Sequence, residues 1–170
     1  SSTPAVTQES VDDIGIPLSM TVKAGSDRTV TVAAAEFFKA QAFRKDGKIE
    51  KKANYRWNFG NGYMRHEQNV FFQYNYPGTY VALVTAEGPN DSKAFTRVTV
   101  TALPAELRIS GDDRGITVYN EGDRELNLSF WSLRSGERHF LLPEDTIVLA
   151  RTKVLFPSEV TGLSSDEVAL

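Results

Sequence analysis

Two aromatic segments constrain the fold of this chain more than any other feature: residues 55–62 (YRWNFGNG) and residues 74–80 (YNYPGTY). The first alternates aromatic and polar side chains and then enters a turn of glycine and asparagine. The second passes through Pro77 and Gly78 and restarts an alternating pattern at Tyr80. A period of two, interrupted by glycine, asparagine and proline, predicts β-strands joined by tight turns.

Short alternating segments of this kind continue through residues 16–101, which predicts an all-β sandwich. Tyr55, Trp57 and Phe59 share one face of their predicted strand, and large aromatic side chains on one face are typical of a sandwich core. Gly60 and Gly62 bracket Asn61, and this pattern predicts a turn with a positive φ at Asn61.

The two aromatic segments together resemble the PKD domain, an immunoglobulin-like β-sandwich family with a WDFGDG segment followed by HxYxxPGxY. Asn58 and Asn61 stand here in place of the two aspartates, and Phe72 stands in place of the histidine. Asparagine accepts the same backbone hydrogen bonds in a turn, so we expect the fold to be kept. The resemblance implies a spacer or interaction module rather than a catalyst.

A second β-rich region follows Leu103-Pro104-Ala105. Residues 118–133 (VYNEGDRELNLSFWSL) resemble the core motif of lamin-tail-like domains, whose pattern is close to LYNPGDEEVDLSGWSL, and residues 140–149 follow the course of that family. The chain departs from it at Phe130, where glycine is usual, and at Ala150-Arg151-Thr152, where Ala-Gly-Gly is usual. The resemblance implies a second immunoglobulin-like fold, and it leaves open whether the fragment contains the whole domain.

We therefore expect an all-β chain of two tandem immunoglobulin-like β-sandwich domains with little helix. The resemblances cover about residues 16–102 and 105–170. The predicted layout is a linker or disordered terminus at 1–14, a PKD-like sandwich at 15–102, a joint at 103–105 and a lamin-tail-like domain at 106–170. The motif residues expected to hold these folds are Trp57, Asn58, Phe59, Gly60, Asn61, Gly62, Tyr74, Pro77, Gly78, Tyr80, Tyr119, Asn120, Trp131 and Leu133.

No catalytic constellation stands out by its spacing. Cysteine is absent, and the two histidines, His66 and His139, fall in different predicted domains. We predict no enzyme, no catalytic residue, no cofactor and no metal site. Asp112 and Asp113 are calcium candidates, but a hairpin turn accounts for them more simply. A net charge of −3 does not favour nucleic-acid binding, and the apolar runs are too short to insert in a membrane.

We expect a non-enzymatic structural, adhesive or protein-interaction segment of a larger prokaryotic surface protein, located outside the cell or at its surface. The alternative is a carbohydrate-binding accessory region of a secreted hydrolase, with Tyr63, Tyr74 and Tyr76 stacking on sugars. Expected partners are neighbouring domains of the same protein, another surface protein or a polysaccharide. The candidate interaction surface consists of outward or loop residues: Phe37, Val81, Leu83, Tyr63 and Tyr76.

Overall fold

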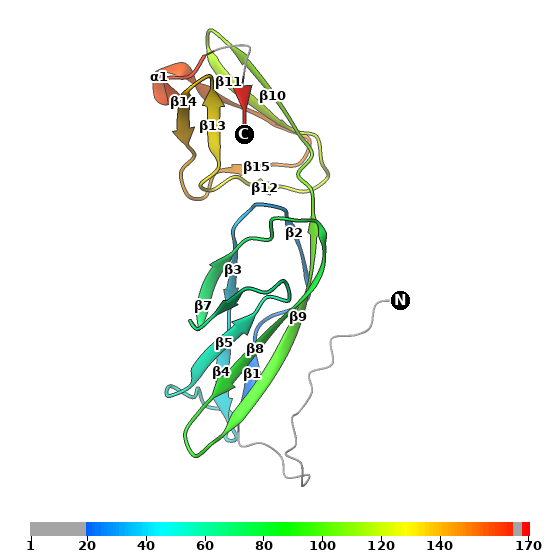
Figure 1. Cartoon of the computed structure of the whole chain (residues 1–170), viewed down its shortest axis with the longest axis vertical. Coiled ribbons are helices and arrows are strands. Elements are labelled where there is room, and N and C mark those ends of the chain that lie inside the picture. The colour runs from blue at the N-terminus through cyan, green and yellow to red at the C-terminus, as the bar shows by residue number, and fades with distance from the viewer. Residues whose placement is uncertain (1–19, 165–167) are drawn as a thin grey trace. The chain divides into compact units, whose positions relative to one another are not determined.

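The computed structural model describes residues 20–164 and 168–170, and their regular structure is almost entirely β (Figure 1). The predicted all-β class is therefore confirmed, and the linker predicted over residues 1–14 lies outside the described residues. Within that described part, the helix is limited to the four residues of α1 (Ser158–Thr161). The chain groups into two compact units, which are described separately below.

Unit 1 contains the described residues up to Val30, then Glu36–Phe72 and Pro77–Ala102. A five-stranded sheet in the order β2-β9-β8-β5-β6 lies with two antiparallel two-stranded sheets, β1-β4 and β3-β7. The strands are β1 (Met20–Lys23), β2 (Arg28–Thr31), β3 (Glu36–Lys39), β4 (Gln41–Arg44), β5 (Asn54–Asn58), β6 (Met64–Arg65), β7 (Asn69–Phe72), β8 (Gly78–Glu87) and β9 (Lys93–Leu103).

The strand registers of unit 1 explain which side chains are buried. Trp57 lies opposite Val84 across β5 and β8, and Ala82 lies opposite Val98 across β8 and β9. Directly opposed residues share a face of an antiparallel sheet, and all four side chains are fully buried. The period-two alternation that predicted this core face is thus confirmed.

Four aromatic rings form the centre of this core. The Phe59 ring stacks on the Phe72 ring with 3.8 Å between centroids, and on the Trp57 ring with 5.6 Å. Phe38, from β3, meets the Trp57 and Phe59 rings edge-on at 5.7 and 5.2 Å. Stacked and edge-to-face pairs add stabilisation beyond the apolar area that they bury. The core therefore ties β3 and β7 to β5 of the main sheet.

The polar atoms of the buried aromatic residues on β5 are also satisfied. The Tyr55 hydroxyl accepts a hydrogen bond from the Ala42 backbone N–H at 3.0 Å, and the Trp57 indole N–H donates to the Gln68 carbonyl at 3.2 Å. Gln68 in turn donates from its amide to the Ala40 carbonyl at 2.7 Å. Both aromatic residues therefore join β5 to segments outside the main sheet.

The turn after β5 forms at the residues where the sequence predicts it. The Asn58 side-chain oxygen accepts from the Gly60 N–H at 2.9 Å, and the Asn61 oxygen accepts from the Tyr63 N–H at 3.3 Å. Gly60 and Gly62 carry the positive φ angles, at 80° and 96°, so the prediction of a positive φ at Asn61 is wrong. A Cβ on Gly60 would lie 2.6 Å from the Val81 carbonyl oxygen, so this position requires glycine.

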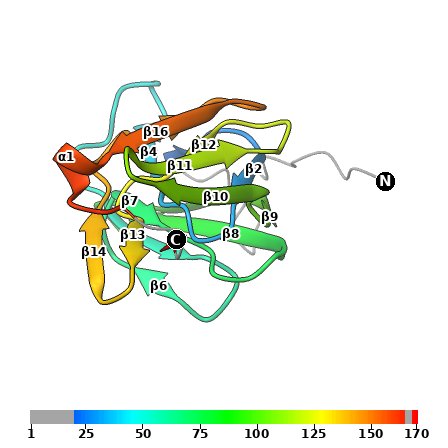
Figure 2. The same cartoon turned by 90° about the horizontal axis from the view of Figure 1, so that it is seen from above.

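Unit 2 contains Thr31–Ala35, Gln73–Tyr76 and Leu103–Leu170. It has three small antiparallel sheets: β10-β11-β16, β12-β15 and β14-β13-β17. Figure 2 shows β10 and β11 side by side, with β16 beyond β11. The strands are β10 (Leu107–Asp112), β11 (Gly115–Asn120), β12 (Leu126–Asn127), β13 (Ser132–Ser135), β14 (Arg138–Leu141), β15 (Ile147–Val148), β16 (Lys153–Pro157) and β17 (Val168–Ala169).

One hydrophobic cluster links the sheets of unit 2. Its buried members come from several strands and from the segments between them: Ile116, Val118, Leu126, Leu128, Leu133, Leu142, Val148 and Leu163. Beside it, the buried amide of Asn120 donates to the carbonyls of Arg124 at 2.7 Å and of Val148 and Leu149 at 3.2 Å each. A buried amide is costly without hydrogen-bond partners. These bonds therefore join the segment before β12 to the end of β15.

Three aromatic motif residues expected to hold the folds are only half-buried: Tyr80, Tyr119 and Trp131. Tyr119 lies on the face of β11 opposite to Val118. The Arg108 guanidinium lies over its ring, 5.1 Å from the ring centroid. Alternation identifies residues that share a face, but the partner elements decide which face is covered.

The turn between β10 and β11 contains the two aspartates that the sequence analysis considered for calcium. Arg114 donates from its guanidinium to the Asp112 carboxylate at 3.0 and 3.3 Å and from its backbone N–H at 2.9 Å. These hydrogen bonds from Arg114 hold the pKa of the Asp112 carboxyl below its usual value. The hairpin interpretation of Asp112 and Asp113 is confirmed.

Replacing Trp57 with alanine should lower the free energy of unfolding by about 3–5 kcal/mol, because a fully buried aromatic side chain is lost from the core. Chemical denaturation followed by circular dichroism measures this. Phe71→Ala, on the exposed face of β7, is the matched control and should cost far less. Equal losses for the two variants would show that the assigned core face is wrong.

Asp112→Asn should lower the melting temperature at neutral pH, because the charged partner of Arg114 is removed while an acceptor for its N–H remains. The folded pKa of Asp112 is depressed, so its stabilisation is present above the unfolded pKa and is lost as pH falls through the folded pKa. The difference between wild type and variant should therefore vanish in strong acid. Asp113→Asn is the control, and a pH-independent difference would contradict the assignment.

Candidate functional site

The outward face of the β3–β7 pair exposes two aromatic rings of unit 1. Phe37 and Phe71 are directly opposed in the register, with 42% and 59% of their surfaces exposed and 4.8 Å between ring centroids. Phe38, the neighbour of Phe37, and Val70, its partner on β7, point into the core instead. The prediction that Phe37 points outward is confirmed. Phe71 was missed, although its alternation with Phe72 in β7 carries the same signal.

The other predicted surface residues differ in their exposure. Val81 is exposed as predicted, but Leu83 is only half-buried rather than fully outward. Tyr63 and Tyr76 are exposed, and they belong to different units. Tyr74 has only 1% of its surface exposed, so the prediction that its ring stacks on a sugar is wrong. Its side chain is buried in the structure and offers no face to a ligand.

Titratable groups do not gather into a metal site in the described part of the chain. No group of three or more His, Asp or Glu residues that could hold a metal ion occurs there. The Asp112 carboxylate is occupied by Arg114, while His66 and His139 are exposed residues of different units. Within residues 20–164 and 168–170, no helix is long and apolar enough to cross a membrane.

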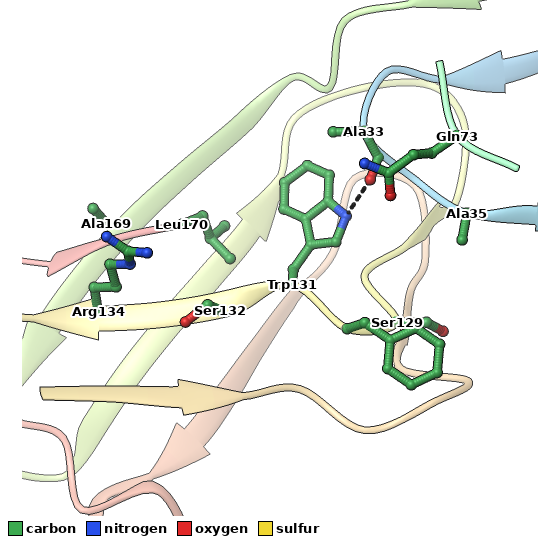
Figure 3. A pocket seen from close by; sticks show the side chains of 10 residues that line it. Ala33, Ala35, Gln73, Ser129, Trp131, Ser132, Arg134, Ala169 and Leu170 are labelled. Carbon is green, nitrogen blue, oxygen red and sulfur yellow. Dashed lines mark hydrogen bonds between the residues drawn. The ribbon is translucent and has the colours of Figure 1, made fainter. Parts of the chain in front are cut away.

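Unit 2 contains an open cavity of about 460 Å³ next to the start of β13 (Figure 3). Trp131 lines this cavity, and its indole N–H donates to the Ala33 carbonyl at 3.0 Å. Ala35, Ala169 and Leu170 add apolar surface to the wall. The hydrogen bond holds the half-buried indole in one orientation, so its ring forms a fixed wall of the cavity.

Phe130 also lines this cavity and has an unusual backbone conformation. Its φ is 65°, in the left-handed region, and 54% of its surface is exposed. The backbone is held there by hydrogen bonds from the Phe130 N–H to the Leu142 carbonyl at 3.0 Å and from the Leu142 N–H to the Trp131 carbonyl at 2.8 Å. A bulky residue at positive φ is strained, and surrounding contacts must maintain it.

The polar side of the cavity is formed by Ser132 and Arg134 of β13, which alternation places on one face of the strand. Among the described residues, the buried Ser132 hydroxyl has no hydrogen-bond partner. The Arg134 side chain is exposed, and its guanidinium makes no hydrogen bond or ion pair with any residue in 20–164 or 168–170. The cavity thus combines aromatic rings with one exposed guanidinium that has no side-chain partner in the described part of the chain, and such a combination can bind a small ligand.

The cavity has almost no local signal in the sequence. The sequence indicated Trp131 only as a motif residue that holds the fold, and Phe130 only as a departure from a family pattern. One clue was present in the sequence. Phe130 stands at a position that usually holds glycine and precedes Trp131, and a bulky aromatic residue is unexpected there. Alternation alone does not reveal that segments 31–35 and 73–76 complete the wall.

Comparison with solved structures finds PKD domains of low similarity. The PKD domain of human KIAA0319 is 23% identical with a TM-score of 0.43, covering 62% of this chain and 95% of that domain. The PKD domain of the human VPS10 domain-containing receptor SorCS2 is 17% identical with a TM-score of 0.37, covering 62% and 93%. A search of curated proteins found no match.

The PKD domain family model matches residues 15–101, which is slightly more than half of the chain. This range includes the stacked core of Trp57, Phe59 and Phe72 and the Asn58–Gly62 turn described above. The match confirms the resemblance drawn from the two aromatic segments, and the fold of the matched region is the all-β sandwich expected for the family. Through residues 15–101, the chain belongs to the PKD domain family.

Proposed function

We propose that this chain is a non-catalytic adhesive or protein-interaction segment of a larger protein displayed at a prokaryotic cell surface. PKD domains are interaction modules that typically occur in extracellular proteins. The observation that carries the proposal is the outward Phe37–Phe71 pair of unit 1. The location at a prokaryotic cell surface is proposed from the sequence patterns alone.

The Phe37–Phe71 pair has the properties of a contact surface. The pairing of β3 with β7 places the two residues opposite each other. The Arg28 guanidinium also donates a hydrogen bond to the Phe37 carbonyl at 3.1 Å. Aromatic residues on a rigid sheet supply apolar contact area at a small entropic cost, and such residues often dominate binding energy. A partner with an apolar protein surface would bury both rings.

We also propose that residues 106–170 form a lamin-tail-like domain. Support comes from the two positions at which the sequence departs from the family pattern. Phe130 and Arg151 both stand where that pattern carries glycine, and both have left-handed backbones, with φ of 65° and 58°. Glycine is the usual residue for this conformation, so a shared backbone explains the family's preference.

Arg151 has a compensating contact at its strained position. Its guanidinium donates to one Asp123 carboxylate oxygen at 2.7 and 3.0 Å, and these hydrogen bonds raise the pKa of Arg151. The Phe130 side chain has no polar atom for such a contact, and its ring is exposed. Its left-handed backbone is held instead by the hydrogen bond from its N–H to the Leu142 carbonyl.

A carbohydrate-binding accessory region of a secreted hydrolase is the second candidate. The exposure of Tyr63 favours it, because an exposed aromatic ring can stack on a sugar, and the Arg65 guanidinium lies 5.7 Å from the centroid of this ring. Tyr76 is exposed as well, whereas Tyr74 is excluded by its burial.

Phe130→Gly should raise the free energy of unfolding by roughly 0.5–1 kcal/mol, since the relief of left-handed strain exceeds the added freedom of the unfolded chain. Denaturation followed by circular dichroism measures the change. Leu141→Gly, at an exposed strand position, should instead destabilise the protein by about the same amount. Destabilisation by both substitutions would remove this support for a lamin-tail-like backbone.

The proposed function predicts that beads coated with the full chain attach to surfaces coated with proteins or polysaccharides. A Phe37→Ser/Phe71→Ser variant should lose attachment to a protein surface while keeping its melting temperature. Val160→Ser, at an exposed apolar position of unit 2, is the control and should attach like wild type.

Attachment of the wild type to none of these surfaces, or equal attachment by the double variant, would overturn the proposal. Attachment to polysaccharide alone that depends on Tyr63 would favour the accessory-region candidate. Turnover of any substrate in a hydrolase screen would contradict the non-catalytic assignment.

A further inference from the structure

The cavity beside Trp131 has a chemical character that the PKD assignment does not explain. It lies in unit 2, its volume is about 460 Å³, and its wall combines aromatic, apolar and donor groups. This volume falls within the range of about 300–1,000 Å³ that is typical of small-ligand sites. We infer that the cavity binds a sugar unit that carries a carboxylate, within an acidic polysaccharide.

The aromatic part of the wall suits the apolar face of a pyranose ring. The Trp131 indole N–H is already occupied by the Ala33 carbonyl, so the ring offers a face rather than a hydrogen bond (Figure 3). The exposed Phe130 ring lies next to it in the chain and in the cavity wall. A ligand contact would explain why phenylalanine stands at this strained position. Glycine would fit the left-handed backbone but would remove the ring.

The polar part of the wall determines the charge of the ligand. Arg134 has no partner among the described residues, and its planar guanidinium matches the geometry of a carboxylate. The Ser132 hydroxyl lies two residues away on the same face of β13 and is also without a partner there. Because the Ser132 oxygen is itself buried, Arg134 is the group of the two that a ligand would contact.

The cavity is open, which suits one unit within a longer glycan. Ala33, Ala35 and Ala169 contribute small side chains to its wall. The inference rests on the proposed function, because it names a ligand class for the interaction module. It uses a different surface, however, from the Phe37–Phe71 pair.

Tryptophan fluorescence provides a direct test with the full chain. The chain has two tryptophans, and Trp57 is fully buried in unit 1, so a ligand-dependent change in emission reports on Trp131. Titration with a galacturonic acid trimer should give a saturable change. A neutral galactose trimer should bind at least about tenfold more weakly, because it lacks the charged partner of Arg134.

Variants separate the contributions of charge and ring. Arg134→Gln should weaken binding of the acidic trimer by about tenfold or more, and Arg134→Lys should restore part of the affinity. Arg138→Gln is the matched control, because Arg138 is an exposed arginine on the adjacent strand β14 outside the cavity wall. Phe130→Gly should weaken both trimers while it stabilises the fold.

The inference is overturned by any of four results: no saturable change with the acidic trimer at millimolar concentration, equal affinity for the neutral trimer, equal loss in Arg138→Gln, or equally tight binding of benzoate. Bead attachment that depends on Phe37 and Phe71 reports separately on the proposed function. If attachment persists while the titration fails, the ligand inference alone falls. If the titration succeeds while attachment to protein-coated surfaces does not depend on Phe37 and Phe71, the contact role of that pair falls and the ligand inference stands.

Discussion

The stack of Trp57, Phe59 and Phe72 is the interaction on which the structure of unit 1 depends. Phe59 lies between the other two rings, with 5.6 Å to Trp57 and 3.8 Å to Phe72 between centroids. The chain can place Phe59 there only because the Asn58 side chain and Gly60 turn the backbone immediately afterwards. Loss of the turn would displace a ring, and loss of a ring would leave the turn without the packing that positions it.

The parts of unit 1 that could be predicted are those in which local sequence and burial agree. The alternation at Tyr55, Trp57 and Phe59 identifies the buried face, and glycine with asparagine identifies the turn. Both are short-range signals that do not depend on distant segments. The exposure of Phe37 could be predicted for the same reason, because its neighbour Phe38 occupies the core.

The candidate site in unit 2 was beyond such reasoning. Trp131 is hydrophobic and adjoins the strand that carries Leu133, so the sequence suggests a core residue. Its actual environment depends on Ala33, almost 100 positions earlier in the chain. Likewise, the left-handed backbone of Phe130 is maintained by Leu142 rather than by its own side-chain preference. Long-range contacts of this kind have no local sequence signal, apart from an unexpected residue at a position that usually holds glycine.

The polar contacts of Tyr55 and Trp57 have a further consequence for strand pairing. Each residue is joined to a backbone group outside the main sheet, at Ala42 and at Gln68. A slip of β5 by one position would turn both side chains to the opposite face and leave a buried hydroxyl contact and an indole donor unmatched. A slip by two positions would keep the same face buried, but it would separate both side chains from these hydrogen-bond partners. The hydrogen bonds of Tyr55 and Trp57 therefore help to specify the register of β5.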